Sequence, residues 1–137
     1  MEADVLGVPV PQGSKRVFNG RLVDVNDRKL KDWRALVGQM AAGSSSQFFT
    51  GPVFVKLDFY LPRPKGHYGS GRNSAVLRPS APLVPATKPD IDKLVRACLD
   101  ALTGMAFRDD SQVAAITARK FYADDRHPGV HIEIEER

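Results

Sequence analysis

The chain has 137 residues and a mass of 15.1 kDa, with 42% hydrophobic residues, 26% charged residues and a net charge of +4. These are ordinary values for one globular domain, and we expect a single domain over 1–137. No apolar run reaches the roughly 18 residues that cross a bilayer, and residues 1–4 lack the layout of a signal peptide, which predicts a cytoplasmic protein without a membrane partner. The single cysteine, Cys98, excludes a disulfide framework and a cysteine-rich zinc site.

Local patterns predict a strand, a hairpin and a helix in the first third of the chain. The apolar run 5–10 predicts a short strand that ends at prolines. Asn19-Gly20 is a favoured two-residue turn, and it predicts a hairpin over 15–25, with strands at 16–18 and 21–23. Apolar residues at helical spacing predict a helix over 27–42, with Gly43 directly after its end.

The middle of the chain combines a regular strand with a long irregular segment. Apolar side chains alternate with others over 53–61, which predicts a half-buried strand. The segment 63–89 is rich in proline and glycine and predicts a long loop. Loops of this length inside a compact domain are usually functional or become ordered on binding.

The last third predicts a second helix and two strands. A strong apolar stripe predicts the helix over 90–103, with Gly104 ending it. Strands are predicted over 112–122, with Ile116, Phe121 and Tyr122 among the packing residues, and over 130–135. The order β-α-β-α-β-β indicates an α+β fold: a mixed four-stranded sheet with two helices packed against it and an extra N-terminal hairpin.

Positive charge is concentrated in two segments. Residues 15–34 hold seven basic residues against three acidic ones, and residues 63–88 hold five basic residues and no acid. This asymmetry indicates a polyanionic partner, with nucleic acid first, although a solvated basic face is the alternative. The residues expected to contact DNA are Lys15, Arg16, Arg63, Lys65, Arg72, Arg78 and Lys88.

Two acidic pairs flank the second predicted helix. Asp90 and Asp92 lie at its start, where aspartate also serves as an N-cap or complements the helix dipole. Asp109 and Asp110 lie in the turn that follows it, where aspartate is also a common turn residue. Because the two ends of such a helix lie about 20 Å apart, periodicity alone does not bring Asp110 to Asp90 and Asp92.

If these carboxylates meet, they form a site made only of oxygen ligands. Such a site selects Mg²⁺ or Mn²⁺ and suits the hydrolysis of a phosphodiester. Arg96, one turn after Asp92, would then face the scissile phosphate, with Lys93 as the competing candidate. Lys88 would contact a neighbouring phosphate.

Several motifs resemble the RusA family of Holliday junction resolvases, in particular its phage and prophage members. The resemblance covers nearly the whole chain. It is carried by Lys88-Pro-Asp-Ile-Asp-Lys-Leu-Val-Arg-Ala-Cys-Leu-Asp-Ala-Leu-Thr-Gly104, Phe107-Arg-Asp-Asp-Ser-Gln-Val113, Val10-Pro-Gln-Gly-Ser-Lys-Arg16 and Phe59-Tyr-Leu-Pro-Arg-Pro64.

The resemblance implies a homodimer that cuts four-way DNA junctions by paired nicks, with a Mg²⁺- or Mn²⁺-dependent site in each subunit. Carried over by position, the metal ligands are Asp90, Asp92 and Asp110. The family pattern has a catalytic lysine where this chain has Arg96, and arginine cannot donate a proton near neutral pH. Either Arg96 acts through its charge alone, which we favour, or Lys93 takes the role of the lysine.

Two other functions are compatible with the sequence. The first is a related metal-dependent nuclease that prefers flaps, forks or other branched DNA. The second is a DNA-binding dimer without catalysis. Acidic side chains within a basic surface argue against the second, because they repel phosphate.

Overall fold

A computed structural model describes residues 1–13, 15–24, 27–44 and 47–137, without the side chains of residues 15–18, 22–24 and 27. Its helices and strands are β1 (Glu2–Leu6), β2 (Lys15–Phe18), β3 (Arg21–Asp24), α1 (Asp27–Ser44), β4 (Val53–Leu61), α2 (Ile91–Leu102), β5 (Val113–Tyr122) and β6 (Gly129–Glu136). Three short 3₁₀ turns are η1 (Lys65–His67), η2 (Gly71–Asn73) and η3 (Asp110–Gln112). No described helix is long and apolar enough to cross a membrane.

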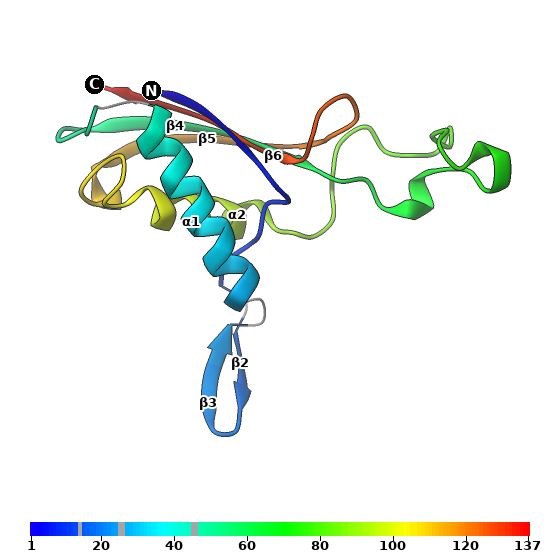
Figure 1. Ribbon diagram of the computed structural model, residues 1–137, viewed down its shortest axis with the longest axis horizontal. Coiled ribbons are helices and arrows are strands. Elements are labelled where there is room, and N and C mark those ends of the chain that lie inside the picture. Colours follow the sequence, from blue (N-terminus) through cyan, green and yellow to red (C-terminus); the bar gives the residue numbers. More distant parts are fainter. Residues whose placement is uncertain (14, 25–26, 45–46) are drawn as a thin grey trace.

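The main sheet has the strand order β1-β6-β4-β5. Strand β4 pairs with β6 in antiparallel and with β5 in parallel orientation, and β1 pairs with β6 in antiparallel orientation. Both α1 and α2 lie on the same side of this sheet (Figure 1). The predicted α+β fold, with a mixed four-stranded sheet and two helices, is therefore confirmed.

The core lies between that side of the sheet and the two helices. Every second residue of β4, from Val53 to Leu61, is buried there. Helix α1 contributes Leu30, Trp33 and Val37 to the same cluster. The alternation of β4 decides which face of the sheet the helices cover, because each strand side chain points opposite to its neighbours.

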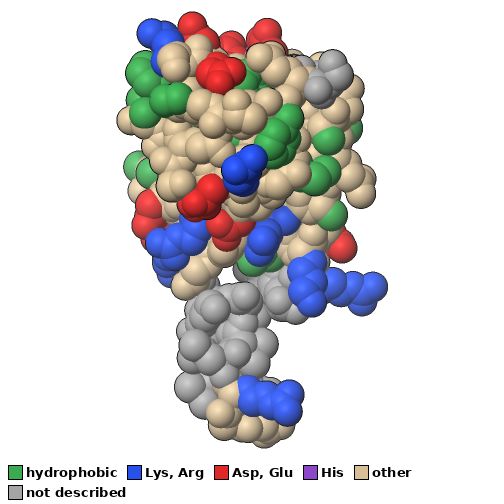
Figure 2. Space-filling view, turned by 90° about the vertical axis from the view of Figure 1, so that its left-hand side faces the viewer, with side chains coloured by type: hydrophobic (Ala, Val, Ile, Leu, Met, Phe, Trp, Pro, Cys, Tyr) green, Lys and Arg blue, Asp and Glu red, His purple; other side chains and the backbone are tan. Residues whose placement is uncertain are grey.

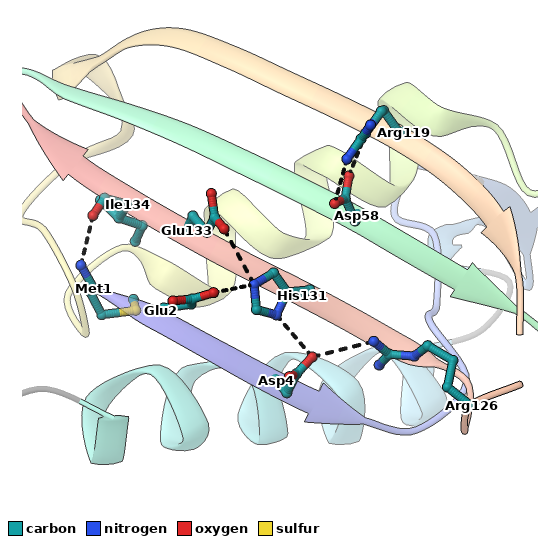
Figure 3. Close-up of polar contacts among 9 residues, drawn as sticks. All are labelled: Met1, Glu2, Asp4, Asp58, Arg119, Arg126, His131, Glu133 and Ile134. Carbon is teal, nitrogen blue, oxygen red and sulfur yellow. Dashed lines mark hydrogen bonds and ion pairs between the residues drawn. The ribbon is translucent and has the colours of Figure 1, made fainter.

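No described helix covers the other face of the sheet. Asp58 is buried within this face, and its two carboxylate oxygens accept hydrogen bonds of 2.8 and 2.9 Å from Arg119 (Figure 3). Asp58 and Arg119 are direct neighbours in the β4–β5 register. The bidentate pair satisfies the carboxylate that the strand alternation places on this face.

The predicted hairpin is confirmed as β2 and β3, which form a separate two-stranded sheet. Asn19 and Gly20 have φ angles of 49° and 74°, so both turn residues adopt the left-handed region that a type I′ turn requires. The hairpin extends away from the helices and the main sheet (Figure 1).

Three local predictions are wrong. The first strand is Glu2–Leu6 rather than 5–10, because Glu2 and Asp4 point to the open face and hide the alternation. Gly43 lies inside α1, which continues to Ser44 instead of ending at residue 42. Ile116 is 44% exposed, because β5 is an edge strand.

The segment between β4 and α2 extends from the rest of the molecule (Figure 1). Its distal part is closed by two backbone hydrogen bonds, from Gly69 N to Val76 O and from Arg78 N to His67 O, both 2.9 Å. We call residues 62–90 the long loop. The loop that the sequence predicts therefore has its own internal hydrogen bonds.

Candidate active site

Asp90 and Asp92 lie where the long loop enters α2. Asp90 occupies the N-cap position with extended backbone angles, but its carboxylate accepts no capping hydrogen bond from the described part of the helix. Its Oδ2 lies 3.6 Å from Lys93 Nζ. Asp92 follows in the first turn, and both aspartates are exposed. The Asp90 side chain therefore does not act as the N-cap that the sequence also allowed.

The segment after β1 lies along α2 next to these residues. The backbone N–H of Gln12 donates to Lys93 O at 3.0 Å, and the side-chain Nε2 of Gln12 donates to the carboxylate of Asp100. A Cβ atom at Gly13 would lie 2.9 Å from Arg96 Nη1, so Gly13 and Arg96 are close neighbours. Gln12 is a site neighbour that the local sequence pattern did not reveal, because its partners lie more than 80 residues away.

Lys120 anchors the chain immediately before Asp90. Its ammonium group donates to the carbonyls of Thr87 and Pro89 at 2.9 and 3.0 Å. Lys120 lies near the carboxyl end of β5, opposite Phe59 of β4. Asp90 and Asp92 are therefore positioned at the carboxyl ends of the parallel pair β4–β5.

Asp110 lies at the other end of that pair. It begins η3, directly before β5, and Gln112 Nε2 ties this turn to the carbonyls of Phe49 and Gly51 at 3.0 Å each, just before β4. Helix α2 has 12 residues and is roughly 18 Å long, so it separates Asp110 from Asp92 by about that distance. A single chain does not bring Asp110 to Asp90 and Asp92.

The neighbours of Asp110 have a structural role. Asp109 and Gln112 form a capping box around η3, and Ser111 Oγ donates to Asp109 Oδ2 at 2.7 Å. The hydrogen bond from Ser111 is the main reason that the pKa of Asp109 is lowered. Asp109 and Gln112 thus explain part of the Asp-Asp-x-Gln pattern by local structure, and Asp110 is left exposed.

The donors at the start of α2 fit a hard divalent cation. Asp90 and Asp92 are exposed carboxylates, and Mg²⁺ is typically bound by one or two carboxylates together with water. Among the described residues, three potential metal-ligand atoms lie within 4.8 Å of one another at Glu2, His131 and Glu133. The aspartates at the start of α2 do not form such a group of three with other described residues.

Four basic residues that the sequence assigns to DNA contact are exposed on the long loop: Lys65, Arg72, Arg78 and Lys88. At the end of the molecule opposite this loop, acidic and basic side chains are interspersed (Figure 2). That end of the molecule therefore lacks the purely basic character of residues 63–88 of the long loop. Lys15 and Arg16 lie on β2, and their side chains are outside what the structure describes.

Arg63 does not fit its predicted role as a DNA contact, because its guanidinium is bound within the protein. It pairs with Asp124 at 2.6 and 3.0 Å, donates to Pro82 O at 2.7 Å and lies 4.2 Å from the ring centre of Tyr122. Its side chain is only 3% exposed. The hydrogen bond from Arg63 is also the main cause of the lowered pKa of Asp124. Arg63 fastens the long loop to the turn between β5 and β6.

Comparison with known proteins identifies the family. The sequence model described as endodeoxyribonuclease RusA matches residues 7–135. The chain belongs to the RusA endodeoxyribonuclease family. It is also 33% identical over 135 residues to YqaN of Bacillus subtilis (strain 168), a protein described as uncharacterised, with 96% of this chain and 93% of YqaN covered.

RusA proteins are endonucleases that act on Holliday junctions. The match to the RusA family includes β4, the long loop, α2 and η3, and thus every part of the candidate site. The resemblance found in the motifs is confirmed at the level of the family.

Lys120→Met tests how the site is held. The variant keeps most of the aliphatic side chain but loses the hydrogen bonds to Thr87 and Pro89. We expect faster amide hydrogen exchange over residues 85–92 and a loss of about 1–3 kcal/mol in the free energy of unfolding. Lys56→Met, on β4, is the control for the loss of a lysine charge. Unchanged exchange in this segment would show that Lys120 does not hold it.

Proposed function

We propose that this RusA family member resolves four-way DNA junctions by paired nicks, as a homodimer that depends on Mg²⁺, with Mn²⁺ as a substitute. The observation that carries the proposal is the position of two exposed carboxylates, Asp90 and Asp92, at the point where a basic loop enters α2. Carboxylates repel DNA unless a cation lies between them and the phosphate. Their position next to Lys88, Lys93 and Arg96 therefore supports catalysis over simple binding.

Asp90 and Asp92 would hold the divalent cation. When bound, such an ion makes water a better nucleophile and stabilises negative charge on the phosphate and on the leaving oxygen. The start of α2 adds the positive end of the helix dipole, which also favours a phosphate at this position. Lys120 keeps the preceding carbonyls in place, so the two carboxylates are presented from a fixed backbone.

Arg96 is the better candidate for contacting the scissile phosphate. Lys93 lies 3.6 Å from Asp90, so its charge is directed at a proposed metal ligand. Arg96 is exposed, lies one turn after Asp92 and is bordered by Gly13, where the absence of a side chain leaves room for its guanidinium. We infer that Arg96 stabilises the charge that develops on the phosphate and transfers no proton.

The exposed basic residues of the long loop would bind the phosphates that flank the cleaved one. Lys65, Arg72, Arg78 and Lys88 are all on this loop, and the loop ends at the proposed metal ligands. Phosphate contacts of this kind supply affinity and position without reading sequence. A branched substrate would then be recognised by the spacing of two such surfaces in a dimer.

Paired nicks require two sites related by a two-fold axis. If Asp110 is also a ligand, one protomer cannot complete the set, because α2 separates Asp110 from Asp92. We infer that each proposed site combines Asp90 and Asp92 of one protomer with Asp110 of the other. This arrangement would make the metal site depend on the dimer.

Asp92→Asn tests the proposed metal ligand. Removing one negative charge is expected to lower the nicking rate in Mg²⁺ by several orders of magnitude. Junction binding in EDTA should be retained or become tighter, because a charge that repels phosphate is lost. The free energy of unfolding should change by no more than about 1 kcal/mol, which is the contribution of an acidic residue near a helix N-terminus.

The matched control is Asp125→Asn, a change of the same kind at an exposed turn residue. It should nick at the wild-type rate. A folded Asp92→Asn protein that nicks as fast as this control would remove Asp92 from the site.

Mixing Asp92→Asn with Asp110→Asn tests whether the site is shared between protomers. Each variant alone is expected to be inactive. In a heterodimer of the two, both changes fall in one shared site and the other site is intact. After random subunit exchange, we expect about a quarter of the wild-type nicking rate, because a quarter of the sites are restored in a two-fold dimer. The measurement is single-strand nicking of a labelled four-way junction.

A mixture that stays inactive, although exchange is confirmed with two differently tagged chains, would contradict a shared site. The role of Asp92 as a metal ligand would still be decided separately, by the nicking rate of Asp92→Asn alone.

A further inference from the structure

A second polar cluster lies on the open face of the sheet, centred on His131 of β6 (Figure 3). In the β1–β6 register, Asp4 is directly opposite His131 and Glu2 is opposite Glu133. Because strand side chains alternate, all four point to the face that the helices leave uncovered. The cluster is therefore on the opposite side of the sheet from α2 and its aspartates.

Both ring nitrogens of His131 face carboxylate oxygens. Nδ1 lies 3.0 Å from Asp4 Oδ1, and Nε2 lies 2.8 Å from Glu2 Oε1 and 3.5 Å from Glu133 Oε1. The ligand atoms of Glu2, His131 and Glu133 are all within 4.8 Å of one another. Arg126 approaches Asp4 from the neighbouring turn at 3.5 Å.

This geometry favours a proton or a metal ion at Nε2. A neutral imidazole donates from one nitrogen only, and Asp4 is placed to accept that proton from Nδ1. The lone pair of Nε2 would then point toward two carboxylates, which is repulsive. Either a proton or a metal ion at Nε2 removes the repulsion, but one N–H cannot point at both Glu2 and Glu133.

We propose that Glu2, His131 Nε2 and Glu133 bind a divalent transition-metal ion of the Zn²⁺ class. One nitrogen and two carboxylate oxygens are donors that suit Zn²⁺ better than Mg²⁺. Asp4 would accept the Nδ1 hydrogen bond, the arrangement that orients metal-binding histidines in many proteins. The remaining coordination position would be open to water.

The ion would join the edge strand β1 to β6. Glu2 is contributed by β1, and His131 and Glu133 by β6, so binding cross-links the two strands. The proposal does not depend on the nuclease assignment, because its ligands are separate from Asp90, Asp92 and Asp110. Metal bound here should stabilise the fold through mass action.

A proton is the competing cation. Partial burial lowers the pKa of His131, but the hydrogen bonds and charges of Asp4 and Glu2 outweigh it, and the pKa is raised overall. The same carboxylates that favour the imidazolium therefore favour a metal ion. A Zn²⁺ titration distinguishes the two occupants.

The test is a calorimetric titration of the full chain with Zn²⁺ alone, at a fixed neutral pH without Mg²⁺, together with a thermal melt. We expect one site that survives in Asp92→Asn and is lost in His131→Gln. Asp4→Asn should weaken it about 10–100-fold, the effect of losing the partner of a metal-binding histidine. His127→Gln, at an exposed histidine in the adjacent turn, is the matched control.

Glu133→Gln is a second variant that keeps the histidine, and circular dichroism confirms that each variant is folded. Loss of the site in both His131→Gln and Glu133→Gln, with no change in His127→Gln, would support the proposal. No Zn²⁺ binding by the wild-type chain, or equally tight binding in a folded His131→Gln or Glu133→Gln protein, would overturn it.

Discussion

The parallel pairing of β4 with β5 dictates the path of the chain between these strands and thereby the position of the candidate site. Parallel neighbours cannot be joined by a tight turn, so the chain must return from the carboxyl end of β4 to the amino end of β5. The long loop leaves at the first end, and α2 makes the return across the covered face (Figure 1). This path places Asp90 and Asp92 at one end of the strands and Asp110 at the other.

Two long-range polar contacts turn that path into a defined site. Arg63 fastens the start of the long loop to Asp124, and Lys120 fastens its end to β5. Between these two contacts, residues 63–88 hold five basic residues and no acid, and the acidic residues Asp90 and Asp92 follow directly. A basic segment and two exposed carboxylates are thus adjacent parts of one connection, and Lys120, which is distant in sequence, fixes the backbone around Asp90.

Local pattern predicts much of the fold and less of the site. The alternation over 53–61 and the turn at Asn19-Gly20 identify their elements, because both depend on adjacent residues. The pairing of Arg63 with Asp124 and of Lys120 with Thr87 and Pro89 could not be predicted, since these contacts join residues 31 to 61 positions apart. The separation of Asp110 from Asp92 likewise follows from topology, which periodicity does not encode. The motifs revealed the family, but the structure shows that one chain does not assemble all three aspartates.

The proposed metal-dependent nuclease site at the start of α2 is tested most directly by incubating the protein with a labelled four-way junction, a replication fork and a linear duplex, each in Mg²⁺ and in EDTA. We expect symmetric paired nicks in the junction in Mg²⁺, no cleavage in EDTA and little cleavage of the duplex. Cleavage of the fork in preference to the junction would indicate a different branched substrate. Equal cleavage of the duplex, or cleavage that persists in EDTA, would contradict a metal-dependent nuclease for branched DNA.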